Sequence, residues 1–212
     1  MKGLRSPVGR LLFGALVIHG LVGSVRAGGA EFDFKDPKGV NNVTFILDSL
    51  LEPFSGVASG ITGKVTFDPA DPKATKGLIS VEAKSLHLEN NGMKRALHGP
   101  DWLDVAKNPK IEFAIKSVTD YKSAGDNVFD LTVVGDLTCK GVTKELTVPV
   151  RATYLAGKLG ERSSKLNGDL LVVRSNFAMK RKDFGIKPDM TDKVVAEEIQ
   201  IQVSIVGVHP KK

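Results

Sequence analysis

The stretch GDLTCKGVTKELTVPV, residues 135–150, decides the fold class, because apolar and polar residues alternate along it on both sides of Gly141. Strict alternation predicts half-buried β-strands, since successive side chains of a strand point to opposite faces of the sheet. Gly141 has the backbone freedom that a tight turn often needs. The alternation extends in both directions, from Phe129 to Tyr154. This part of the chain therefore predicts a long antiparallel hairpin with one apolar and one polar face.

The same alternation recurs along the rest of the chain and predicts six more strands. Turn-forming residues separate them, and they cover residues 42–47, 57–67, 77–88, 110–118, 165–181 and 194–208. Residues 89–109, between the third and fourth strands, predict a short helical insert. Eight strands joined by short turns predict an all-β domain in which an antiparallel sheet curls into a barrel or a sandwich. The strands are long for a sandwich, which favours a deep barrel.

Residues 1–27 have the pattern of a signal peptide. Three basic residues precede a mostly apolar run over residues 11–25, and Ala27 follows at a cleavage position. The pattern predicts a periplasmic protein, secreted by this signal; cleavage after Ala30 and an uncleaved anchor are the alternatives. The rest of the chain is divided into a lead-in at residues 28–40, one domain at residues 41–208 and a tail at residues 209–212.

The charge of the chain argues against nucleic acid as a partner. The formal net charge is +6, but four of the 30 basic residues lie in residues 1–27, which leaves 26 basic and 24 acidic residues. A nucleic-acid interface needs a clustered basic face, and the only dense cluster is residues 180–182. Cys139 is the only cysteine, so no disulfide forms within the chain.

Catalytic and metal-binding motifs are not found in the sequence. It has no nucleophile elbow, phosphate-binding loop or zinc-binding helix of the standard patterns. His87 and His98 flank the helical insert and, with Asp101 or Asp104, could contribute to acid–base chemistry or to a metal site. Their spacing matches no standard ligand pattern. We therefore expect no catalytic residue and no metal site.

Four segments together resemble the YceI-like family, small secreted bacterial proteins described as polyisoprenoid-binding and lipocalin-like. The similarity covers about residues 41–208, and its motifs are GDLTxxGVT at residues 135–143, DWLD with NP and IEF at residues 101–113, GKVTFDP at residues 63–69 and RKDFGI at residues 181–186. The chain departs from the family's usual pattern at Val40-Asn41, at Ser49 and at residues 95–99. These departures concern polar groups near one barrel mouth. They therefore put in doubt whether the ligand has the same head group as in the family.

The resemblance implies an eight-stranded antiparallel lipocalin-like barrel with a long apolar cavity. It also implies a ligand, a long-chain isoprenoid, a quinone-like molecule or another apolar lipid, and no further cofactor. Trp102 and Leu103 of the insert would close one mouth, and Arg181 and Lys182 would contact an anionic head group. The residues expected to line the cavity are Phe45, Leu47, Ile61, Val65, Phe67, Trp102, Leu103, Phe113, Ile115, Leu131 and Val133.

Three functions follow from this interpretation. The first is a non-catalytic binding protein that carries or sequesters an apolar lipid, with transient membrane contact. The second is a lipid-processing enzyme that uses His98 or His87 as acid or base. The third is a filled barrel that acts as a structural or interaction module, because large side chains such as Phe45, Phe67 and Phe113 could occupy the interior. A small barrel of this kind is also compatible with a homodimer.

Overall fold

The computed structural model describes residues 28–211. The predicted signal peptide, residues 1–27, lies outside this range. Within it, no helix is both long and apolar enough to span a membrane.

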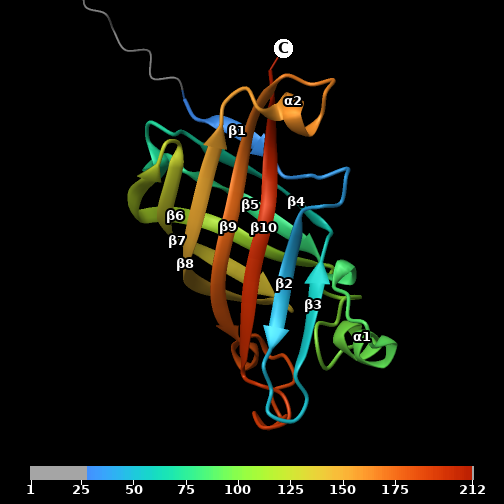
Figure 1. The fold of residues 1–212 in the computed structure, drawn as a ribbon. Helices are drawn as coiled ribbons and strands as arrows, with labels where there is room; N and C mark the ends of the chain where they lie inside the picture. The colour runs from blue at the N-terminus through green and yellow to red at the C-terminus, as the bar shows by residue number, and fades with distance from the viewer. Residues whose placement is uncertain (1–27, 212) are drawn as a thin grey trace, which may run out of the picture.

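The structure is built from ten β-strands with a few short helices (Figure 1). The helices and 3-10 turns are η1 (Pro72–Ala74), η2 (Ala83–Ser85), α1 (Asn91–His98), α2 (Leu159–Arg162) and η3 (Arg181–Phe184). The strands are β1 (Ala30–Asp33), β2 (Asn42–Leu47), β3 (Phe54–Ala58), β4 (Ile61–Phe67), β5 (Lys76–Glu82), β6 (Lys110–Gly125), β7 (Val128–Cys139), β8 (Val142–Leu155), β9 (Gly168–Lys180) and β10 (Glu198–Pro210).

The ten strands occupy eight positions in the wall of a closed antiparallel barrel. The order of pairing is β1-β4-β5-β6-β7-β8-β9-β10, and β1 closes the ring by pairing with β10. Strands β1 and β2 both pair with the same edge of β10, one after the other, and together fill one position. Strands β3 and β4 fill the next position in the same way, because β3 pairs with β2 and β4 pairs with β1. The predicted eight-stranded antiparallel barrel is therefore confirmed.

The hairpin predicted at residues 135–150 is the β7–β8 pair. Lys140 and Gly141 form its turn, both with positive φ (49° and 74°), which is the geometry of a two-residue hairpin turn that follows the twist of the strands. Along β7 every second residue from Phe129 to Cys139 is apolar or glycine and buried, and the residues between them, most of them polar, are half-buried. The apolar face of the hairpin thus points into the barrel, as the alternation predicts.

Several predicted boundaries are corrected by the structure, among them the end of the strand predicted at residues 77–88, since β5 ends at Glu82 and Ala83–Ser85 form η2. Residues 28–40, predicted as a lead-in, contain β1, and both Phe32 and Phe34 beside it are fully buried. A strand of four residues is too short to show a clear alternation, which is why the sequence pattern missed it. Residues 57–67, predicted as one strand, belong to β3 and β4, which are separated at Ser59-Gly60.

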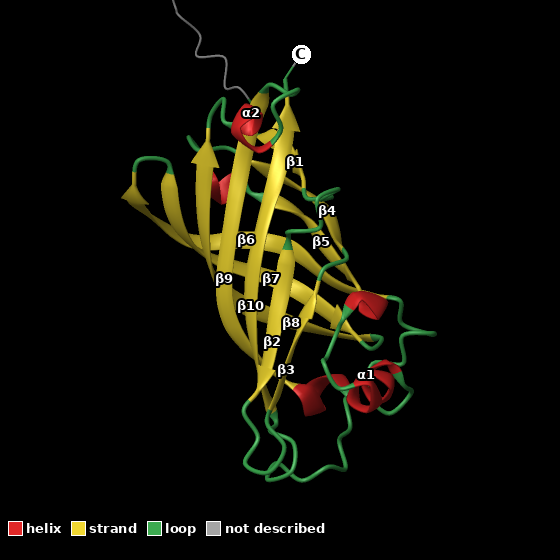
Figure 2. Ribbon diagram, turned by 45° about the vertical axis from the view of Figure 1, so that its right-hand side comes forward, coloured by secondary structure: helices red, strands yellow, loops and turns green. Residues whose placement is uncertain are grey.

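The helical insert lies at one end of the barrel and α2 at the other (Figure 2). Helix α1 begins at Asn91, and the Asn90 side chain caps it by accepting a hydrogen bond from the Met93 backbone N–H at 3.0 Å. The insert therefore sits where it can cover the end of the barrel at which β2 ends and β3 begins (Figure 1).

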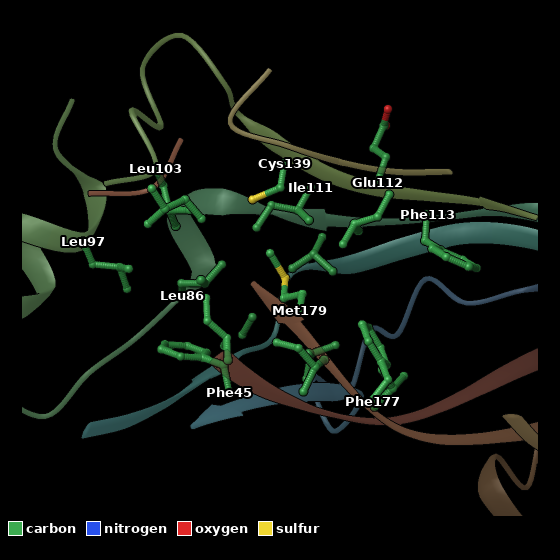
Figure 3. Close-up of a pocket in the computed structure, with 18 of the residues that line it drawn as sticks. Phe45, Leu86, Leu97, Leu103, Ile111, Glu112, Phe113, Cys139, Phe177 and Met179 are labelled. Carbon is green, nitrogen blue, oxygen red and sulfur yellow. The ribbon is translucent and has the colours of Figure 1, made fainter. Parts of the chain in front are cut away.

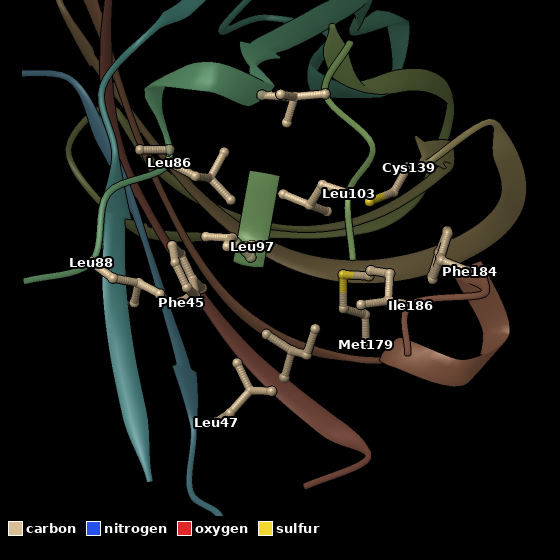
Figure 4. Packing of buried hydrophobic residues seen from close by; sticks show 14 of the residues in the cluster. Phe45, Leu47, Leu86, Leu88, Leu97, Leu103, Cys139, Met179, Phe184 and Ile186 are labelled. Atoms are coloured by element: carbon tan, nitrogen blue, oxygen red, sulfur yellow. The ribbon is translucent and has the colours of Figure 1, made fainter. Parts of the chain in front are cut away.

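At the same end, β8 and β9 diverge. They pair only between residues 150–155 and residues 170–175, so the first half of β8 and the last half of β9 are not paired with each other. Apolar side chains from η3 and the loop after it fill this end: Phe184 and Ile186 belong to the same buried cluster as Cys139 and Met179 (Figure 4). Part of the barrel floor is therefore made by a loop.

Candidate functional site

The barrel encloses two apolar cavities. The first, here the insert-side cavity, has a volume of about 150 Å³ and is bordered by Leu97, Trp102 and Leu103 of the insert (Figure 3). The second, here the distal cavity, has a volume of about 110 Å³ and lies toward the other end of the barrel. Nearly all atoms that line either cavity are apolar.

The predicted lining residues divide between the two cavities. The insert-side cavity takes Phe45, Leu47, Trp102, Leu103 and Phe113. The distal cavity takes Val65, Phe67, Phe113, Ile115, Leu131 and Val133. Ile61 lines neither; it is 3% exposed and packs in the buried cluster around Phe32 and Phe67.

The polar groups in the cavity walls are already occupied. Thr75 and Ser175, in the wall of the distal cavity, donate their hydroxyl hydrogens to the carbonyl oxygens of Pro72 and Pro149, each at 2.6 Å. Glu112 borders the insert-side cavity, but its carboxylate points away from the other lining side chains (Figure 3). Among the described residues, no buried side-chain polar atom is left without a hydrogen bond. The walls therefore suit an apolar ligand, because a polar one would find no free partner.

The insert forms a fixed cover over its cavity. The Trp102 ring meets Phe54 of β3 edge-on, with ring centroids 5.9 Å apart. His98 Nε2 lies 2.8 Å from the Leu86 carbonyl oxygen, which ties α1 to the segment that follows β5. Leu103 is buried and donates its N–H to Leu97. Trp102 and Leu103 thus border the insert-side cavity at the end where the insert lies.

The two candidate histidines lie in different surroundings. The ring of His98 is bonded to a backbone carbonyl, and His87 is exposed while its backbone pairs with Val57. In the part of the chain that the structure describes, no group of three or more His, Cys, Asp or Glu side chains is arranged to hold a metal ion.

Arg181 is corrected from a head-group residue to a structural one. It is 0% exposed, whereas a head-group contact requires an accessible guanidinium. Its nitrogens donate to the carbonyl oxygens of Ile186, Lys187, Met190, Val195 and Ala196 and to the carboxylate of Asp192. With its donors used in this way, Arg181 holds residues 186–196 in place. Lys182 is half-exposed and pairs with Asp192 at 2.8 Å.

Several residues that line the insert-side cavity are not among those predicted from the sequence. Phe177, Met179, Ile199 and Ile201 share the inward faces of β9 and β10, and their alternation could have identified them. Leu86 and Ile186 come from non-strand segments, for which the sequence carries no periodic signal.

Cys139 also lines the insert-side cavity. Burial raises the pKa of its thiol to about 12, so it is protonated at neutral pH and acts as a small apolar wall residue.

A closed β-barrel with apolar internal cavities defines a class of proteins able to hold small apolar ligands. The YceI-like domain model matches residues 36–207. Over 159 residues, 74% of each chain, the sequence is 35% identical to a UPF0312 protein of Pseudomonas putida. It is 30% identical over 156 residues, 74% of each chain, to Protein YceI of Escherichia coli. The chain belongs to the YceI-like family.

A solved structure has the same fold. It is a polyisoprenoid-binding domain from Saccharophagus degradans, which superimposes with a TM-score of 0.60 at 8% identity and covers 86% of this chain and 99% of that one. At this identity the similarity shows the fold alone.

Replacing Arg181 tests its structural role. We expect Arg181→Ala to lower the free energy of unfolding by about 3–5 kcal/mol, because it leaves several carbonyl oxygens and one carboxylate without their donor. Arg181→Lys is also destabilising, since an ammonium group has three donors and cannot form the same fork. Urea denaturation measures both. The control is Lys180→Ala at the exposed neighbouring position, where the change is within about 0.5 kcal/mol; equal stability of Arg181→Ala and wild type would contradict the assignment.

Proposed function

We propose that the protein is a non-catalytic binding protein that holds a long-chain isoprenoid, a quinone-like molecule or another apolar lipid inside its barrel, and so carries or sequesters it. The observation that carries this proposal is the insert-side cavity, whose wall is apolar and which Trp102 and Leu103 of the insert border. Membership of the YceI-like family and the fold shared with a polyisoprenoid-binding domain support it. Both favour binding over catalysis.

The affinity would come from burial of the tail. Each methylene group moved from water into the cavity contributes roughly 0.8 kcal/mol, so a prenyl tail needs no hydrogen bond to bind. The polar head group would stay at the mouth. Lys182 is the remaining candidate for contact with an anionic head group. The head group would compete with the Asp192 carboxylate for the Lys182 ammonium group.

We place this function in the periplasm. The support is the pattern of residues 1–27, with its basic start and its apolar run up to Val25. In that compartment an apolar lipid needs a carrier, because its tail is poorly soluble in water.

Native mass spectrometry of the mature protein, purified from the periplasm without detergent, tests the proposal. We expect a stoichiometric adduct that releases one apolar species on organic extraction. A bare mass, with no uptake of added prenol, would favour the filled-barrel alternative. The enzyme alternative is separated by His98→Ala, which leaves lipid binding intact in a carrier and abolishes turnover in an enzyme that uses this histidine.

Transient contact with a membrane is a further part of the proposal. The turn between β2 and β3 exposes Leu50 and Leu51, at 77% and 64% of their surface. Its backbone is nevertheless fixed: Ser49 Oγ accepts the Ala196 N–H at 2.8 Å, and the Leu51 N–H donates to the Lys193 carbonyl at 3.1 Å.

The position of this turn links it to the cavity. The residues on either side of it, Leu47 and Phe54, both line the insert-side cavity, so the two exposed leucines lie at the mouth end of the barrel (Figure 1). Burying a leucine side chain in the bilayer contributes about 1.5–3 kcal/mol. A fixed apolar tip beside the mouth would hold the barrel against the bilayer while the lipid passes.

Co-sedimentation with phosphatidylcholine vesicles tests the membrane contact. We expect the Leu50→Ser/Leu51→Ser variant to bind the vesicles at least about tenfold more weakly than wild type, since each tenfold corresponds to about 1.4 kcal/mol. Val40→Ser is the matched control, because Val40 is 59% exposed at the opposite end of β2. Unchanged binding of the double variant would exclude this tip as the contact.

A further inference from the structure

Three residues line both cavities and lie at the boundary between them. They are Ile79, Phe113 and Val203. Ile79 and Phe113 are directly opposite each other on the paired strands β5 and β6. Val203 comes from β10, where it pairs with Val43 of β2 and Ser175 of β9. The interior therefore has a waist, to which β5 and β6 contribute two side chains and β10 a third.

The Phe113 ring lies against the neighbouring strand at Gly135. A Cβ atom placed on Gly135 would lie 2.5 Å from Cζ and 2.8 Å from Cε1 of Phe113. Side chains do not approach so closely, so only glycine leaves room for the ring here. Gly135 opens the GDLT motif and Phe113 closes the IEF motif. The two motifs thus form one steric unit that positions an aromatic ring at the waist.

The volumes indicate what this ring does. A cavity of about 150 Å³ is large enough for one benzene ring, and neither cavity here exceeds that volume. A tail of about the size of one benzene ring, such as a single five-carbon prenyl unit, can occupy the insert-side cavity alone, but a longer tail must pass the waist to use the distal cavity as well. Phe113 is the largest of the three side chains at that point.

We propose that Phe113 is a gate that sets which tail lengths the barrel holds. The ring admits a single prenyl unit to the insert-side cavity without moving, and longer tails bind only when it leaves the waist and so joins the two cavities. Phe113 is in this sense a specificity-determining residue. The inference rests on the proposed lipid-binding function and adds the length of the tail as the property that is selected.

A series of prenols of increasing length tests the gate. Delipidated wild-type protein, Phe113→Ala and Phe177→Ala are titrated with 3-methylbut-2-en-1-ol, geraniol and farnesol, which have one, two and three prenyl units, and the dissociation constants are compared. Phe177→Ala is the matched control, because Phe177 is also a half-buried wall residue but lines only the insert-side cavity. The readout is the affinity for farnesol relative to 3-methylbut-2-en-1-ol, so that a general loss of apolar contact cancels.

We expect Phe113→Ala to raise this ratio at least about tenfold over wild type, a change of about 1.4 kcal/mol. Phe177→Ala is expected to leave it within about twofold. If all three proteins bind all three prenols with the same ratio, the gate is refuted while the lipid-binding function stands. If wild type binds no prenol, the proposed function itself fails.

A second variant covers the case in which Phe113→Ala is too unstable. Phe113→Leu keeps an apolar side chain at the waist and removes the flat ring, so it should shift the ratio in the same direction by a smaller factor. Thermal unfolding of each variant shows that the protein measured is folded. An unchanged ratio in folded Phe113→Leu and in folded Phe113→Ala would overturn the gate.

Discussion

The interior of this barrel depends on aromatic rings that rest on glycine residues of the neighbouring strand. Phe113 rests on Gly135, and Phe45 on Gly56, where an added Cβ would lie 2.3 Å from the ring. Any larger residue at these glycines would push the rings into the lumen. Since both phenylalanines line the insert-side cavity, the positions of these rings on their glycines set how much space remains inside the barrel.

At the end of the barrel near the insert, the hydrogen bonds of Arg181 hold a loop in place, and Arg181 itself does not line the cavity. Arg181 uses its donors on backbone carbonyls of the loop that follows η3. Phe184 of η3 and Ile186 and Val195 of that loop belong to the same buried cluster. A buried charge is tolerated here because it is fully hydrogen-bonded. The loop and the insert thus both contribute apolar side chains at this end of the barrel.

Alternation of apolar and polar residues predicts the long strands of this fold, because a long strand shows the alternation several times over. The β7–β8 hairpin and the inward positions of Phe45, Phe113 and Leu131 follow from period-two patterning alone. Strand β1 was not predicted, because four residues are too few to show a clear alternation. The structural role of Arg181 could not be predicted for a different reason. Most of its partners are backbone carbonyl oxygens, which every residue has, so no sequence pattern indicates them.

The division of the interior could not be predicted either. Phe113 and Gly135 are 22 positions apart in the sequence, and their contact depends on the register of β6 against β7. Alternation identifies both as inward-facing but does not say which ring lies on which glycine. The family resemblance predicts one long cavity, whereas the structure has two that meet at a waist.

The measurement that tests the central claim most directly uses Trp102, which is the only tryptophan of the chain and borders the insert-side cavity. Delipidated protein is titrated with an apolar lipid whose tail carries bromine, a quencher of indole fluorescence at short range. An apolar ligand held in this cavity predicts saturable quenching that is complete at one equivalent and is reversed by excess geranylgeraniol. Quenching that rises linearly with probe and is unaffected by the competitor would mean that the tail never enters the barrel, and would contradict the account.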